Sequence, residues 1–141
     1  MIIKAMMKKE TNGEIRELTK AELEIMQILW DKGQAFVHEI QDCMPDPKPA
    51  YNTISTFVRI LEKKGAVAHE VFGKSHRYYP TFGREAYARG VMHGVVQNFF
   101  NNSYAQMVSF FCEKEHLSVA ESEEILAIAQ KAIAQVKQRK K

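Results

Sequence analysis

The feature that most constrains the fold is the stretch 49–81, PAYNTISTFVRILEKKG followed by AVAHEVFGKSHRYYPT. In its first half, apolar residues recur at intervals of three and four, which predicts one amphipathic helix of about four turns that ends at Gly65. Two runs of strand-forming residues follow, 67–71 and 77–81, on either side of the loop Phe72-Gly73-Lys74-Ser75. The order therefore predicts a helix and then a β-hairpin.

The predicted helix has two unlike faces. Its apolar face comprises Ala50, Ile54, Phe57, Val58 and Leu61. Its other face carries small polar and basic groups of the kinds that contact base edges in the major groove of DNA. These base-reading candidates are Tyr51, Asn52, Thr53, Ser55, Thr56 and Arg59. A solvated outer face is the alternative interpretation, because surface helices are commonly polar outside.

The segment LTKAELEIMQILWDKG predicts the first helix of the chain. Thr19 and Glu22 have the spacing of a capping box, Leu18 and Leu23 that of a hydrophobic staple, and Gly33 is placed to end the helix. Its apolar residues wrap more than half of its circumference, so the helix must be covered on two sides.

Residues 34–36 predict a short strand and 37–44 a short helix, followed by the turn PDPKP. Each proline there removes a backbone donor and restrains the residue before it, so the turn cannot be helical in its interior. Helix, helix, proline-stiffened turn and helix make a helix-turn-helix in which the third helix would read DNA.

Charge supports a polyanionic partner. Residues 48–90 carry eight basic and three acidic side chains, whereas residues 1–47 carry six and nine. A local positive field attracts DNA phosphates, and the hairpin could lie along the DNA backbone as a wing. A hairpin that merely closes the core is the alternative. The phosphate-contacting candidates are Lys48, Lys63, Lys74, His76 and Arg77.

From Gly83 onward the pattern is helical, with helices near 83–100 and 104–113 and a third announced by Ser118 and Glu121, a second capping box. Three amphipathic helices in about 55 residues bury too little surface alone, which favours pairing with a second copy of the chain. An aromatic-lined ligand pocket is the alternative use of this tail. The dimerisation candidates are Val95, Phe99, Tyr104, Met107, Val108, Phe111, Ile125, Ile128 and Ile133.

The predicted fold class is thus mostly α: a winged helix-turn-helix head of three helices and a small β-hairpin wing, with a C-terminal helical dimerisation segment. The predicted divisions are a flexible arm (1–15), the winged-helix DNA-binding domain (16–82), the helical dimerisation domain (83–138) and a disordered tail (139–141).

Other classes of protein are not favoured. No nucleotide-binding, hydrolase or metalloprotease motif is present, and the five histidines are dispersed, so we expect neither an enzyme nor a metal or cofactor site. Cys43 and Cys112 lie far apart, and we expect two free thiols, buried or half-buried. The chain has neither an apolar run of eighteen residues nor a signal-peptide pattern, which predicts a cytoplasmic protein without membrane insertion.

LTKAELEIMQILWDKG, YNTISTFVRILEKKG and the short wing that ends in Tyr-Tyr-Pro resemble the penicillinase repressor (BlaI/MecI/CopY) family of winged-helix transcriptional repressors. The resemblance covers about residues 15–138. It implies a homodimer, joined through its C-terminal helices, that binds a two-fold-symmetric operator with TACA-like half-sites. It also implies derepression through a partner membrane sensor protease that causes the tail to be cut, as in antibiotic resistance regulation.

Some positions match the family and others depart from it. Thr53 and Thr56 stand where the family has recognition-helix threonines, but its arginine commonly falls one position after Arg59, where this chain has Ile60. The pair that matches the family's Asn-Phe cleavage bond is Phe110–Phe111, which lacks the asparagine. Asn101-Asn102 replaces a glycine pair and can also adopt left-handed conformations.

Copper sensing is not expected, because the chain lacks the C-terminal cysteine cluster of the copper-responsive branch. Two alternatives to the protease-regulated repressor stay open at this point. One is a ligand-responsive regulator with a small-molecule pocket between head and tail, and the other is a winged-helix adaptor that binds proteins.

Overall fold

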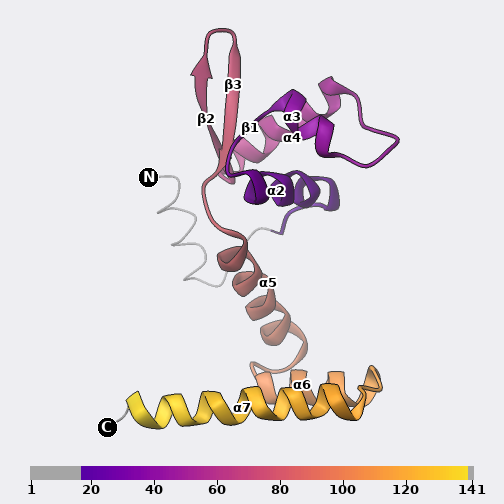
Figure 1. The fold of residues 1–141 in the computed structure, drawn as a ribbon, viewed down its shortest axis with the longest axis vertical. Coiled ribbons are helices and arrows are strands. Elements are labelled where there is room, and N and C mark those ends of the chain that lie inside the picture. The colour runs from indigo at the N-terminus through magenta and orange to yellow at the C-terminus, as the bar shows by residue number, and fades with distance from the viewer. Residues whose placement is uncertain (1–16, 140–141) are drawn as a thin grey trace. The chain divides into compact units, whose positions relative to one another are not determined.

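The computed structural model describes residues 17–139 (Figure 1). They form two compact units, divided between Gly94 and Val95, which we call the N-terminal and C-terminal units. The predicted arm 1–15 lies outside the described residues, as do residues 140 and 141 of the predicted tail. Arg139 is the last residue of the last helix.

The N-terminal unit is a winged helix (Figure 1). Its three strands form an antiparallel sheet in the order β1-β3-β2, in which Ala35 pairs with Tyr78 and His69 pairs with Tyr78 from the other side. The β2–β3 hairpin is the wing, and the predicted fold class is confirmed. The elements are α2 (Lys20–Lys32), β1 (Ala35–Phe36), α3 (Val37–Cys43), α4 (Tyr51–Lys63), β2 (Val67–Phe72), β3 (Ser75–Pro80) and the start of α5 (Arg84–Phe99).

Both predicted ends of α2 are confirmed. The backbone N–H of Glu22 donates to the Thr19 hydroxyl oxygen (3.2 Å), and the backbone N–H of Thr19 donates to Glu22 Oε1 (2.9 Å). At the other end, Gly33 has a φ of +86°, a conformation that side chains rarely tolerate. Local sequence therefore sets where this helix begins and ends.

The core of the unit lies between the three helices and the base of the sheet. Apolar residues from every helix and from the start of β2 are almost completely buried there, as the apolar arc of each helix predicts. The most deeply buried large side chains are Ile25, Met26, Leu29, Ile40, Ile54, Val58, Leu61 and Val67.

The second side of α2 is covered by the segment that leads into α5. The indole N–H of Trp30 donates to the carbonyl oxygen of Phe82 (2.8 Å), and its ring packs against Phe82 and Tyr87 at centroid distances of 6.4 and 6.0 Å. The Tyr87 hydroxyl in turn accepts a hydrogen bond from the backbone N–H of Leu18 (2.9 Å). The predicted two-sided covering of this helix is therefore confirmed.

Two expectations from the sequence need correction. The strands of the hairpin extend further than predicted, to Phe72 and from Ser75, and leave a two-residue turn in which Gly73 has a φ of +61°. A two-residue turn whose first central residue has positive φ matches the twist of antiparallel strands, so the ladder continues to the turn.

The expectation of buried or half-buried cysteines is also wrong, since both are exposed. Cys43 ends α3, whose buried face is formed by Val37 and Ile40. Cys112 lies on α6, a helix that has no buried residue. Cysteine tends to be buried because it is a small apolar side chain, but α3 faces the core with other residues and α6 buries none.

The C-terminal unit contains the end of α5, α6 (Tyr104–Lys114) and α7 (Val119–Arg139). Asn101 and Asn102 make the turn after α5 with φ values of +52° and +62°, the left-handed conformation expected of them. The Ser118 hydroxyl accepts a hydrogen bond from the backbone N–H of Glu121 (3.1 Å), as predicted for a capped helix.

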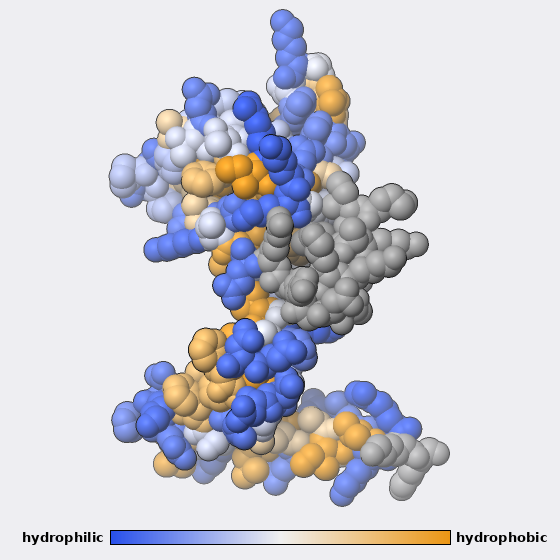
Figure 2. All heavy atoms as spheres, turned by 180° about the vertical axis from the view of Figure 1, so that it is seen from behind, coloured by the Kyte–Doolittle hydropathy of each residue, from blue (hydrophilic) through white to orange (hydrophobic). Residues whose placement is uncertain are grey.

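Little of the C-terminal unit is buried. Val96 is 1% exposed, but neither α6 nor α7 has a single buried residue. Apolar side chains consequently lie at its surface (Figure 2). Within residues 17–139, no helix has the length and apolarity needed to cross a membrane.

Candidate nucleic-acid interface

The exposed face of α4 carries all six base-reading candidates. Five of them are exposed and Ser55 is half-buried, while Ile54, Val58 and Leu61 turn into the core. The first turn of α4 has no acidic residue. Since no charge there would repel a phosphate, this face can approach the negatively charged groove of DNA.

The side chain of Thr56 is already oriented by its own helix. Its hydroxyl donates a hydrogen bond to the carbonyl oxygen of Asn52 (2.9 Å), one turn earlier. The proton is thus used, and the methyl group and an oxygen lone pair are left to contact a base. A threonine methyl suits the methyl group of thymine.

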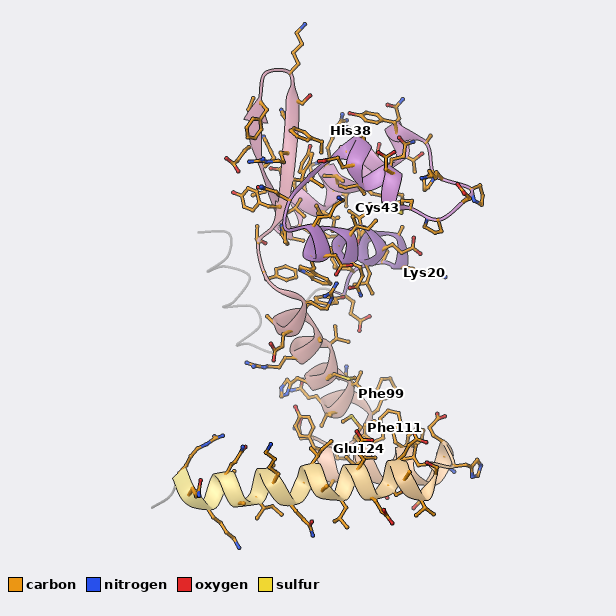
Figure 3. All side chains as sticks on the ribbon, in the orientation of Figure 1. Lys20, His38, Cys43, Phe99, Phe111 and Glu124 are labelled. Carbon is orange, nitrogen blue, oxygen red and sulfur yellow. The ribbon has the colours of Figure 1, made fainter. Side chains whose placement is uncertain are left out.

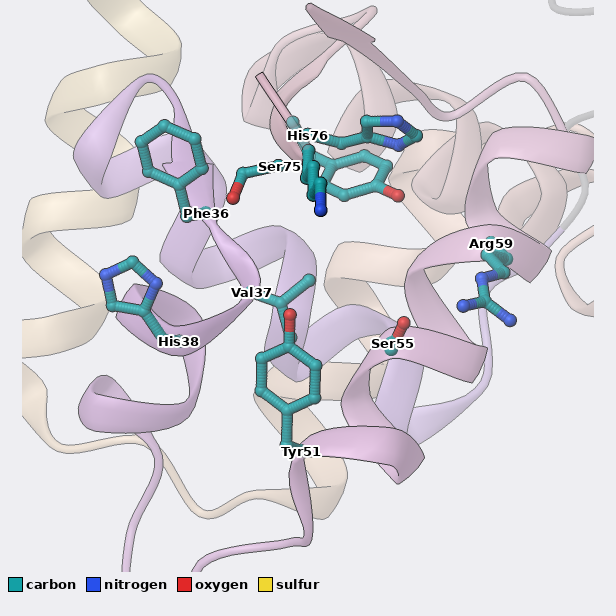
Figure 4. A pocket seen from close by; sticks show the side chains of 10 residues that line it. Phe36, Val37, His38, Tyr51, Ser55, Arg59, Ser75 and His76 are labelled. Atoms are coloured by element: carbon teal, nitrogen blue, oxygen red, sulfur yellow. The ribbon is translucent and has the colours of Figure 1, made fainter. Parts of the chain in front are cut away.

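A polar hollow lies between α4, the start of α3 and the wing, with a volume of about 220 Å³. Tyr51, Ser55 and Arg59 enter it from successive turns of α4, as Figure 4 shows. No acidic side chain lines it. The lining residues are Phe36, Val37, His38, Tyr51, Ser55, Arg59, Lys74, Ser75, His76 and Tyr78.

Phe36, His38 and Tyr78 are part of this hollow but were not among the predicted site residues. They reach it because β1 pairs with β3, so that Phe36 lies opposite Arg77. A short strand over residues 34–36 was predicted and is found at Ala35–Phe36, but its partner strand was not predicted. Figure 3 shows His38 on the ribbon of the short helix α3 that follows β1.

The phosphate-contacting candidates fall into two groups. Lys74 and His76 are exposed and line the hollow. Lys63 and Lys48 are exposed outside its lining, and Lys48 Nζ donates to the carbonyl oxygen of Asp42 (2.9 Å).

Arg77 differs from the other candidates. Its guanidinium lies 4.3 Å from the centre of the Phe72 ring and 3.6 Å from Glu70 Oε1, and its Nε is buried without a hydrogen-bond partner. The side chain is half-buried and held against the wing by a cation–π contact. In this position Arg77 stabilises the wing.

Two histidines of the wing face each other. The rings of His69 and His76 are stacked with their centroids 4.2 Å apart, and His69 Nδ1 lies 2.6 Å from Glu62 Oε2. Neighbouring Tyr78 is 5% exposed, and this burial, together with the charge of Glu62, raises the pKa of its phenol. Within residues 17–139, no group of three or more histidine, cysteine or acidic side chains is arranged to hold a metal ion.

Comparison with known proteins assigns the chain to a family. Residues 18–131 match the family model described as penicillinase repressor. The chain belongs to the penicillinase repressor family. Members of this family are DNA-binding regulators and not enzymes, so the chain is a DNA-binding transcriptional repressor.

Two relatives and one solved structure illustrate the similarity. The chain is 30% identical to the penicillinase repressor of Bacillus licheniformis over 116 residues, which cover 82% of this chain and 91% of the relative. It is 30% identical to the methicillin resistance regulatory protein MecI of Staphylococcus aureus (strain N315), over 82% of this chain and 94% of that protein. The solution structure of the DNA-binding domain of the repressor BlaI aligns with a TM-score of 0.45 and 28% identity, over 50% of this chain and 88% of that one.

In this repressor the dimerisation candidates lie mostly at the surface. Seven of the nine are exposed, and only Val95 and Met107 are half-buried. Ile128 is 63% exposed and Ile133 is 54% exposed, and Ala132, Ile133 and Val136 line a shallow apolar groove on α7. Figure 3 labels Phe99 and Phe111 of the same set.

The pair that corresponds to the family's cleavage bond lies within helix α6. Phe110 and Phe111 are each 43% exposed, and their rings meet edge to face with centroids 6.0 Å apart. Phe110 also packs on Phe100, at 5.5 Å. The side chains are accessible, whereas the bond between them is part of a hydrogen-bonded helix.

Proposed function

We propose that this repressor acts as a homodimer that binds a two-fold-symmetric operator, with one α4 helix in each of two successive major grooves. The observation that carries the proposal is the continuity of the exposed face of α4 with the acid-free hollow beside the wing. A DNA duplex presents base edges beside phosphates, and this surface offers the matching groups side by side.

Within this surface we propose a division of labour. The base-reading side chains are those of the exposed face of α4, from Tyr51 to Arg59, because side chains on the outer face of a recognition helix reach base edges. Lys74 and His76 contact phosphates from the wing, and Lys63 and Lys48 contact them from either end of α4. Arg77 shapes the wing and is not one of the phosphate contacts.

The proposal of a homodimer rests on the apolar faces of the C-terminal unit. Exposed isoleucine, valine and aromatic side chains on α6 and α7 have no cover within the described chain. A two-fold pair would cover both copies of this face at once, because the same patch serves both partners. Such a dimer would also present two copies of α4, as a two-fold operator requires.

The proposed inducing step is cleavage through a partner membrane sensor protease, by analogy with the family. The relatives matched over most of their length include a penicillinase repressor and a methicillin resistance regulator. Cutting between Phe110 and Phe111 would separate α7 from the rest of the chain. A protease binds an extended segment, so α6 must first unwind locally. The repressor would act in the cytoplasm, where the operator is.

The proposed division of labour is tested by measuring affinity for the operator and for random duplex. Arg59→Ala should weaken operator binding by about 1–3 kcal/mol and random DNA much less, because it removes contacts to base edges. Lys74→Ala should weaken both DNAs alike and reduce the salt dependence of binding. Equal loss on both DNAs for Arg59→Ala would remove Arg59 from the base-reading set.

A further inference from the structure

We propose that the hollow between α4 and the wing binds one backbone phosphate of the operator and that the stacked His69–His76 pair takes up a proton as it does so. This inference rests on the proposed function and adds a regulatory property to the same surface. Operator affinity would then fall as the pH rises through the neutral range.

The two histidine rings lie close enough together for their charges to interact. The two imidazole rings are nearly parallel, 10° apart in tilt, with centroids separated by 4.2 Å. Two like charges at that distance repel each other strongly unless each has a counter-charge. Among residues 17–139, the counter-charge that contacts the pair is Glu62, whose Oε2 lies 2.6 Å from His69 Nδ1.

The two rings differ in their exposure and in their access to the hollow. His76 is exposed and lines the hollow, whereas His69 is half-buried and does not. A phosphate in the hollow would supply the missing counter-charge on the side of His76. The doubly protonated pair would then lie between two anions, Glu62 and the phosphate. An imidazole titrates between about pH 5 and 8, so this uptake falls in the physiological range.

The remaining charges favour a phosphate in the hollow. Arg59 and Lys74 line it and attract an anion. The acidic side chain of the wing, Glu70, is already paired with Arg77. The titratable or charged side chains that line the hollow or contact the pair are Arg59, Glu62 and Tyr51 from α4, His38 from α3, and Lys74 and Tyr78 from the wing. Glu70 and Arg77 lie on the other face of the hairpin.

The coupling between proton uptake and DNA binding determines whether operator affinity rises or falls with pH. Because the bound state holds more protons than the free state, affinity is highest where His76 is protonated and declines as the pH rises. Between about pH 6 and pH 8 at constant ionic strength, we expect the operator affinity of the full chain to fall roughly tenfold.

The experiment compares the full chain with three substitutions by anisotropy titration of operator duplex across that pH range. His76→Gln should flatten the pH dependence to within about twofold across this range. His69→Gln should also reduce the slope, because it removes one of the coupled rings. His93→Gln is the matched control: this exposed histidine of α5 lies outside the hollow and should leave the slope unchanged.

A second readout reports the proton directly. Calorimetric titrations near pH 7, in two buffers that differ in ionisation enthalpy, should give net proton uptake for the wild type and markedly less for His76→Gln. A wild-type slope retained by His76→Gln, or equal heats in the two buffers, would overturn the inference. Failure of the proposed function would look different: the wild type would then bind operator and random duplex equally at every pH.

Discussion

Both units of this repressor contain amphipathic helices, but the apolar sides of these helices are buried in one unit and exposed in the other. In the N-terminal unit, the apolar arcs of α2 and α4 are buried, with Leu29 and Val58 at 0% exposure. In the C-terminal unit, α6 and α7 carry equally clear apolar arcs, and no residue on either helix is buried. An amphipathic pattern thus shows which side of a helix is apolar, whereas the burial of that side depends on the rest of the fold.

Because of this difference in burial, we expect the two units to depend differently on a second chain. The N-terminal unit closes its own core and holds the DNA-binding surface on it, so its stability should not depend on a second chain. For the C-terminal unit we propose that a second copy supplies the cover. Substitutions in the two units test that distinction.

The largest effect should come from the core of the N-terminal unit. Ile54→Ala should lower the free energy of unfolding of this unit by about 2–5 kcal/mol, because it leaves a cavity beside Val58 and Leu61. Chemical denaturation measures it. Ile60→Ala on the same helix is the control: Ile60 is 38% exposed, and the same truncation should cost less than about 1 kcal/mol. Equal costs at the two positions would contradict the assignment of the core.

The next effect concerns the face on α7. Ile133→Asp should raise the dimer dissociation constant by about 100-fold, since it places a carboxylate in the apolar groove of each copy. Sedimentation equilibrium measures the change. Ala127→Asp adds the same charge on the opposite side of α7 and should leave the dissociation constant within about threefold of the wild type. A dimer insensitive to Ile133→Asp would place the interface elsewhere.

A smaller, pH-dependent effect is expected at Glu22, which is 3% exposed. Burial by itself would raise the pKa of this carboxyl, but hydrogen bonds from Lys64 Nζ (2.7 Å) and the Thr19 backbone N–H outweigh burial and lower it. A carboxyl whose pKa is lowered by folding stabilises the protein above its ordinary value of 4.5, and this contribution is lost as the pH falls below that value.

The Glu22→Gln variant tests this. Near pH 7 it should lower the free energy of unfolding by about 1–2 kcal/mol, and the difference from the wild type should shrink as the solution is acidified. Denaturation curves at several pH values measure this trend. Glu24→Gln, at an exposed position of the same helix, should have little effect at any pH. A Glu22→Gln difference that grew on acidification would reverse the assigned sign.

The smallest effect is expected where the two units divide. Gly94 lies inside α5, and a Cβ atom added there would meet nothing within 4 Å. Gly94→Ala should therefore stabilise α5 by about 0.4–1 kcal/mol, through the lower entropy of the unfolded chain, as hydrogen exchange of the α5 amides would show. Gly33→Ala should be destabilising instead, because Gly33 has a φ of +86°. Faster exchange in Gly94→Ala would show that α5 needs the glycine.

Local sequence predicted much of the fold because many of its determinants are local. The capping pairs Thr19–Glu22 and Ser118–Glu121 and the stop at Gly33 involve residues close in the chain. The pairing of β1 with β3 is different, since it joins residues about forty apart, and it is this pairing that brings Phe36 to the wing.

The candidate DNA-binding site was likewise predictable only where it depends on local sequence. The exposed face of α4 follows from helical periodicity alone. The role of Arg77 does not, because nothing in the order of residues shows that its guanidinium stacks on Phe72 and faces Glu70. His38 was missed for a similar reason, since the hollow that it lines exists only after the strands have paired.

We propose that two N-terminal units, held together by their C-terminal units, bind one operator. Hydroxyl-radical footprinting of the full chain on the promoter of its own gene tests this arrangement. We predict two protected half-sites, related by a two-fold axis and about one helical turn of DNA apart, which Ile133→Asp weakens together. A single protected half-site, unaffected by Ile133→Asp, would show that the repressor does not bind its operator as a symmetric dimer.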